Sequence, residues 1–132
     1  MPSAVDIRGQ VFRDGSATLL ARVIGGDGAS LIRSDITQVH YTVYLLDHND
    51  PNLREAVEGH EEREVPPAGL LFDAPQLDSL WTVDAIGYNF RHVLDVSANA
   101  AFPLAGRTYL VVFKLTPTVG PVILVRFRLT AI

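Results

Sequence analysis

Histidines are the side chains best suited to proton transfer or metal binding at neutral pH. This chain has four, His40, His48, His60 and His92, and none forms an H-x-H or H-x-x-x-H pair or has a carboxylate at the spacing of a zinc protease. His40 and His92 fall in segments with strand character, so the two could meet across a sheet beside a carboxylate. A half-buried histidine with satisfied hydrogen bonds is more common than a ligand, and we predict no metal site.

Other catalytic signatures are equally weak. The stretch LDHNDPN offers oxygen ligands for calcium, but Pro51 stands where a calcium loop would turn and Glu58 is not its twelfth residue. No serine lies in a G-x-S-x-G elbow, and the glycine-rich VIGGDGAS lacks the lysine of a phosphate-binding loop. A Ser-His-Asp group assembled from distant loops stays open, since triads are defined by geometry. We predict no enzyme activity and no cofactor. A β-barrel enzyme built on His40 and His92 is the least favoured alternative.

The stretch LWTVDAIGYNF, residues 80–90, contains the only tryptophan of the chain. Asp84 can accept backbone N–H bonds and Gly87 can adopt a positive φ, which together favour a turn. Trp81 would then cover the edge of the core, and Phe90 would begin the next strand beside Tyr88. We interpret Trp81, Asp84, Gly87, Tyr88 and Phe90 as a structural corner. The alternative is an aromatic platform that binds carbohydrate or peptide.

The charged residues do not indicate a nucleic-acid surface. The net charge of −4 disfavours a broad phosphate-binding face. Several arginines could form a stripe on one sheet face, but Tyr109, Phe113 and Phe127 have the opposite parity and would not stack on bases between them. The arginines concerned are Arg22, Arg91, Arg107, Arg126 and Arg128. They predict a solvated or salt-bridged face.

A period of two dominates the chain and predicts half-buried strands. It is clearest in TQVHYTVYLLD, RTYLVVFKLTP, PVILVRFRLTAI and NFRHVLDV, with shorter strands expected at Glu61–Val65 and Gly69–Phe72. A turn at TPTVGP joins the last two long strands. Near the start, Val5–Phe12 and Ala17–Ile24 flank Asp14-Gly15, which favours a tight hairpin.

These elements predict an all-β fold, an antiparallel sandwich of about seven or eight strands. A chain of 132 residues is the size of one domain, which we place at 1–132. The polar segment His48–Ala68 is expected to be one long loop with the least order.

Composition and the first residues define the expected location. The chain has no cysteine, so no disulfide or thiolate site is expected. No basic segment followed by an apolar one opens the sequence, and no apolar run approaches the roughly 20 residues that span a bilayer. We therefore expect a protein made in the cytoplasm without a signal peptide and not inserted in a membrane.

Two stretches together carry a resemblance to a known family. LWTVDAIGYNF and FPLAGRTYLVVFKLTPTVGPVILVRFRL resemble small immunoglobulin-like β-sandwich modules of phage and prophage structural proteins, in which W-x-x-D-x-x-G-Y-N-F precedes a P-x-x-G-x-x-Y strand. The stretch from DGSATLLARVI to YTVYLLD is similar to the opening hairpin of baseplate-type domains of this kind. The resemblance covers most of the chain. It implies an immunoglobulin-like fold and a role in assembly or attachment, and it carries no active-site residue.

The two C-terminal strands are apolar on both parities. Leu110, Val112, Val122 and Leu124 lie opposite to the inward-facing set. A sandwich of this size has one core and no covering helices, so we expect another copy or another subunit to cover these residues. The leading hypothesis is a non-enzymatic structural module of a virion, tail or comparable extracellular particle. The alternative is a carbohydrate- or cell-surface-binding module that uses exposed aromatic residues.

Overall fold

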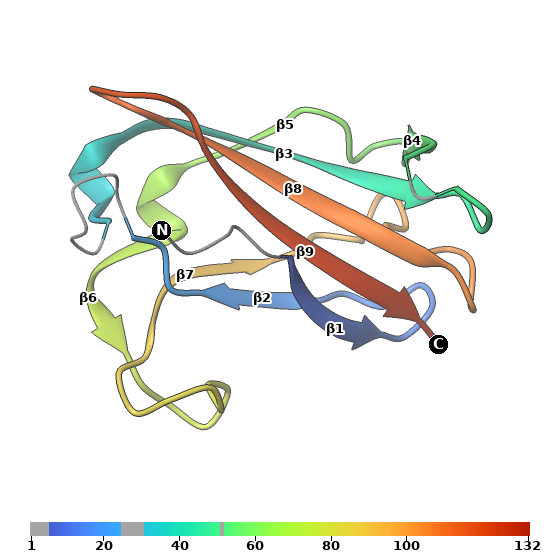
Figure 1. The fold of residues 1–132 in the computed structure, drawn as a ribbon, viewed down its shortest axis with the longest axis horizontal. Coiled ribbons are helices and arrows are strands. Elements are labelled where there is room, and N and C mark those ends of the chain that lie inside the picture. The colour runs from blue at the N-terminus through green and yellow to red at the C-terminus, as the bar shows by residue number, and fades with distance from the viewer. Residues whose placement is uncertain (1–5, 25–30, 51) are drawn as a thin grey trace.

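Two β-sheets packed face to face make up the structure, a computed structural model that describes residues 6–24, 31–50 and 52–132. Figure 1 shows the long strands β3, β8 and β9 side by side in one layer and β2, β7 and β6 in the other. The described residues contain no α-helix, only two 3-10 turns, η1 (Arg33–Asp35) and η2 (Pro67–Gly69). The strands are β1 (Ile7–Val11), β2 (Thr18–Ala21), β3 (Ile36–Leu46), β4 (Arg54–Ala56), β5 (Arg63–Val65), β6 (Leu71–Gln76), β7 (Tyr88–Val93), β8 (Thr108–Pro117) and β9 (Ile123–Ala131). The expected all-β sandwich is confirmed at this level.

The larger sheet has the strand order β1-β9-β8-β3-β4, and β5 also pairs with β3. The smaller sheet has the order β2-β7-β6. Neighbouring strands are antiparallel except β1, which runs parallel to β9 from Ile7 opposite Phe127 to Val11 opposite Ala131. The first and last strands of the described chain therefore lie side by side.

The core lies between the two sheets and is centred on aromatic rings. Phe90 of β7 stands edge-on to Phe113 of β8, with 4.9 Å between ring centroids, and lies 5.9 Å from Phe127 of β9. All three side chains are almost fully buried. The alternation of side chains along β8 and β9 directs the rings of Phe113 and Phe127 inward, because successive side chains of a strand point to opposite faces of a sheet.

The hairpin expected from Val5–Phe12 and Ala17–Ile24 is wrong. The turn forms, since the N–H of Gly15 donates to the carbonyl of Phe12 over 2.8 Å. Beyond it, however, β1 joins β9 in the larger sheet while β2 joins β7 in the smaller one. The chain crosses from one layer to the other at this turn. Which sheet each strand joins is decided by its partner, β9 or β7, and these partners lie far away in the sequence.

The segment His48–Ala68 is more ordered than expected. It contains β4 and β5, which pair one after the other with β3 and extend the edge of the larger sheet. The C-terminal hairpin, in contrast, is confirmed, with β8 and β9 paired from Thr108 opposite Thr130 to Leu115 opposite Ile123. Within the described ranges, no helix has the length and apolar character needed to cross a bilayer.

Candidate interaction surface

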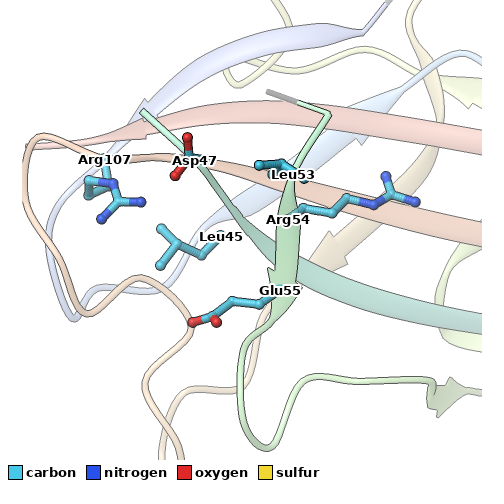
Figure 2. A pocket seen from close by; sticks show the side chains of 6 residues that line it. All are labelled: Leu45, Asp47, Leu53, Arg54, Glu55 and Arg107. Atoms are coloured by element: carbon cyan, nitrogen blue, oxygen red, sulfur yellow. The ribbon is translucent and has the colours of Figure 1, made fainter. Parts of the chain in front are cut away.

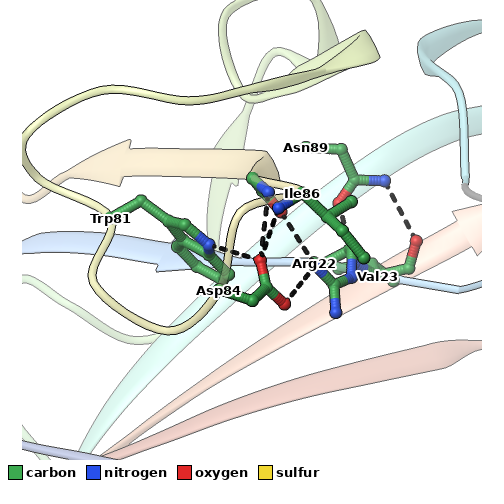
Figure 3. A network of polar contacts seen from close by, with 7 residues as sticks. Arg22, Val23, Trp81, Asp84, Ile86 and Asn89 are labelled. Atoms are coloured by element: carbon green, nitrogen blue, oxygen red, sulfur yellow. Dashed lines mark hydrogen bonds and ion pairs between the residues drawn. The ribbon is translucent and has the colours of Figure 1, made fainter.

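The corner at residues 80–90 is organised by one carboxylate. Asp84 Oδ1 accepts hydrogen bonds from Trp81 Nε1 at 2.9 Å, from Ile86 N at 3.0 Å and from Gly87 N at 3.2 Å. Its other oxygen lies 2.6 Å from Arg22 Nη1 on the segment after β2. Figure 3 shows these contacts converging on Asp84 between Trp81 and Arg22. The carboxylate thus fixes the turn and ties it to the neighbouring strand.

Gly87 and Tyr88 explain why this turn needs its residue types. Gly87 has a φ of +110°, and a Cβ at this position would collide with the backbone carbonyl of Gln76. The Tyr88 hydroxyl donates to Asp78 Oδ2 over 2.7 Å, and its buried ring lies 5.9 Å from that of Trp81. Phe90 follows in the core. The five residues of the stretch therefore have structural partners.

Neutralising Asp84 is expected to remove a pH-dependent part of the stability. The bond from Trp81, then the contact with Arg22 and the two backbone N–H groups, hold the pKa of Asp84 well below its ordinary value of 3.8. A lowered pKa stabilises the fold above pH ~4, and this contribution disappears as the pH falls towards the folded-state pKa. Urea unfolding of the wild type and of Asp84→Asn should therefore differ most above pH ~4, and the difference should shrink steadily as the pH falls below ~4 towards the folded-state pKa. A difference that is independent of pH would contradict this assignment.

A groove opens between β1 and β2, beside the corner. It has a volume of about 380 Å³ and is lined by both strands, by Phe127 and Leu129 of β9, and by residues 80–83. Ile7 has the parity of the core residue Phe127, yet it is 39% exposed. Phe12 and Val83 at the rim are 74% and 73% exposed. The sandwich is incompletely closed here and presents apolar surface.

The surface expected on the C-terminal strands is corrected. Leu110 and Val112 are only 2% and 9% exposed, because they form a second small core with Leu46 on the outer face of the larger sheet, against Tyr44. Long side chains from flanking strands stand beside them, such as Arg128 opposite Leu110, and such stems cover apolar surface well. The chain itself therefore buries these two residues. Val122 and Leu124, in contrast, are 51% and 54% exposed near the β8–β9 turn.

The histidines do not meet in one pocket. His92 packs against the rings of Tyr41 and Phe113 inside the sandwich, and burial lowers its pKa. His40 neighbours Tyr41 along β3 and therefore points to the opposite face of the larger sheet. His60 is buried, with Nδ1 at 2.8 Å from the Tyr41 hydroxyl and Nε2 at 2.8 Å from the carbonyl of Asn99. In the part of the chain that the structure describes, no three His, Cys, Asp or Glu side chains are grouped to hold a metal.

A shallow pocket of about 340 Å³ lies at the other end of the larger sheet. Figure 2 shows Asp47, Leu45 and Glu55 facing Arg107 across it, while Arg54 points away. The Arg54 guanidinium instead stands 4.1 Å over the Tyr44 ring, and Arg107 Nη2 donates to the carbonyl of Leu46 over 2.9 Å. These groups brace β3 and β4, and no nucleophile stands beside a base among them.

The arginines do not form a single stripe on one sheet face. Arg22 binds Asp84 at the corner, and Arg107 binds the end of β3. Arg126 and Arg128 share one carboxylate, that of Asp6, at 2.9 and 3.2 Å.

Asn89 is an important residue that reasoning from the sequence missed. It is buried, and its Oδ1 accepts from Val23 N at 2.7 Å while its Nδ2 donates to the carbonyls of Val23 and Leu31 at 3.0 and 2.9 Å. Figure 3 shows Asn89 beside Val23. The sequence offered one signal: Asn89 stands between the aromatic residues Tyr88 and Phe90 in a predicted strand. A polar residue at such an outward position is ordinarily solvated, so its burial was not expected.

Comparison with known proteins adds no relative. The chain matches no protein-family model, no curated protein and no solved structure.

Proposed function

We propose that this protein is a non-enzymatic, immunoglobulin-like structural module that joins a multisubunit particle, such as a virion or tail, through its apolar groove. The observation that carries the proposal is the open edge between β1 and β2, where inward-facing Ile7 is exposed and Phe12 and Val83 stand at the rim. Apolar surface gathered around one groove is typical of protein contact sites.

The strand order supports the immunoglobulin-like part of the proposal. A five-strand path, β1-β9-β8-β3-β4, faces the three-strand sheet β2-β7-β6. Strands that follow each other in sequence, such as β1 and β2, β2 and β3, or β7 and β8, lie in different sheets. This alternation between layers, with the first strand parallel to the last, is the connectivity expected of that sandwich type.

The edges of β1 and β2 favour a polypeptide as the occupant of the groove. In the described residues, β1 pairs only with β9 and β2 only with β7, so each strand has one unpaired edge beside the groove. Unpaired edges accept a further extended segment through backbone hydrogen bonds, while apolar pockets hold its side chains.

Replacing Val83 by aspartate tests the proposal. Val119→Asp is the matched control, because Val119 is also exposed, at 89%, but lies on the β8–β9 turn away from the groove. We expect Val83→Asp to fold and to be lost from the native assembly, measured as co-migration in size-exclusion chromatography of the producing cells' extract. Val119→Asp should assemble normally. Normal assembly of Val83→Asp would overturn the groove as the contact site.

Carbohydrate binding is the second candidate function, and the position of Trp81 favours it. Trp81 is partly exposed and lines the groove together with polar residues, among them Thr18 and Thr82. If glycans bind there, the fluorescence of this single tryptophan should shift on titration with them, because the ring would lose contact with water. An unchanged spectrum across a glycan panel would remove this candidate.

A further inference from the structure

We propose that copies of this chain associate head to tail, with the basic β1–β9 edge of the larger sheet of one copy against the acidic β4–β5 edge of the next. This inference rests on the proposed assembly function and names a partner for it, a second copy. Arg8 and Gln10 of β1 also border the apolar groove, but they have the outward parity of Arg128 and Thr130, so their side chains point to the face of β1 opposite to that of Ile7.

The basic edge consists of three arginines around one carboxylate. Arg126 and Arg128 of β9 both bind Asp6, with side chains 39% and 24% exposed. Arg8 of β1 stands opposite Arg128 in the parallel register and is exposed. No hydrogen bond or ion pair links the Arg8 side chain to another described residue. One aspartate cannot neutralise three guanidinium groups, so this edge keeps an excess of positive charge.

The acidic edge is the opposite border of the same sheet. Between Asp47 and Val65 the sequence has seven acidic residues and two arginines. This excess of negative charge is larger than the net charge of −4 of the whole chain, so the remainder carries a slight positive excess. Glu55 on β4 and Glu64 on β5 are exposed, as is Glu58 between the two strands.

The separation of charge across one sheet determines the type of contact. β1 and β4–β5 occupy the two ends of the strand order, so their charged edges face away from each other. Two identical edges repel, whereas the basic edge of one copy attracts the acidic edge of another. Such a contact joins two different patches and therefore continues into a ring or a filament. It should weaken with salt, because exposed charges are screened over about 8 Å at physiological ionic strength.

Charge reversal of each edge separately gives the test. The first variant, Arg8→Glu with Gln10→Glu, makes the β1 edge acidic, and both positions are exposed. The second, Glu55→Lys with Glu58→Lys and Glu64→Lys, makes the β4–β5 edge basic. Arg33→Glu is the control, because Arg33 is exposed on η1 away from both edges. Circular dichroism verifies that each variant is folded.

Sedimentation velocity of the purified chain at about 50 mM salt, a concentration of weak screening, should show wild type and Arg33→Glu as dimers or larger. Each edge variant alone should be monomeric. An equimolar mixture of the two should associate again, because one then has two acidic edges and the other two basic edges. A monomeric wild type, an edge variant that associates like wild type, or a mixture that stays monomeric would overturn the head-to-tail contact. If Val83→Asp fails to assemble while both edge variants associate like wild type, the groove stands as the contact site and the head-to-tail contact is rejected. If the edge variants are monomeric while Val83→Asp assembles normally, the head-to-tail contact stands and the groove is rejected.

Discussion

Replacing Asn89 by leucine is expected to lower the free energy of unfolding by about 4 kcal/mol, because three buried hydrogen bonds disappear and a bulkier apolar side chain of the same branching takes the place of the amide. The N–H of Val23 and the carbonyls of Val23 and Leu31 would lose their bonds to this amide. Unpaired buried polar groups cost more than the net value of the bonds they made. Urea unfolding at 25 °C measures the effect.

Asn89→Asp is the informative companion of this variant. It keeps the acceptor for the Val23 N–H but places a second oxygen, instead of an NH₂ group, against the two carbonyls. The loss should be at least as large as for leucine, since a carboxylate would be buried beside two acceptors. If the free energy of unfolding of Asn89→Leu lies within about 1 kcal/mol of the wild-type value, the amide does not hold the backbone at Val23 and Leu31 in place.

Phe90→Ala is expected to lower the free energy of unfolding by about 4 kcal/mol, as large-to-small substitutions in cores do. Phe90 is fully buried and contacts Phe113 and Phe127 of the larger sheet from its place in the smaller one. The substitution removes apolar area and leaves a cavity between the two sheets. Thermal and urea unfolding should agree on the size of the loss.

Phe12→Ala is the control for Phe90→Ala. The Phe12 side chain is 74% exposed, so its truncation should change the stability by less than about 0.5 kcal/mol. Equal effects of the two substitutions would mean that Phe90 does not occupy the centre of the core.

Periodicity predicted the strands well because burial on one face leaves a direct trace in the sequence. β9 alternates between buried and more exposed residues along its length, and parity correctly places Tyr109, Phe113 and Phe127 on the inner face. The identity of the strand with which each strand pairs leaves no such trace in the sequence. β1 and β2 flank a good turn at Asp14-Gly15, yet they pair with β9 and β7, which lie far away in the sequence.

The candidate interaction surface was less predictable, since parity says on which face a residue lies but not what covers that face. Leu110 and Val112 do lie on the outer face, but neighbouring side chains, including Tyr44, bury them. At the groove beside β1 the reverse occurs, because a residue with inward parity is exposed. Ile7 has inward parity, and only the separation of β1 from β2 leaves it exposed.

The parallel pairing of β1 with β9 has a mechanical consequence. Tension applied before β1 and after β9 would pull these two strands past each other along their length, so the bonds from Ile7–Phe127 to Val11–Ala131 would be strained together. Breaking them together requires more force than opening a ladder one bond at a time, and the contacts of Asp6 with Arg126 and Arg128 add to the resistance. Tension applied at these two points would therefore load the β1–β9 pair in shear.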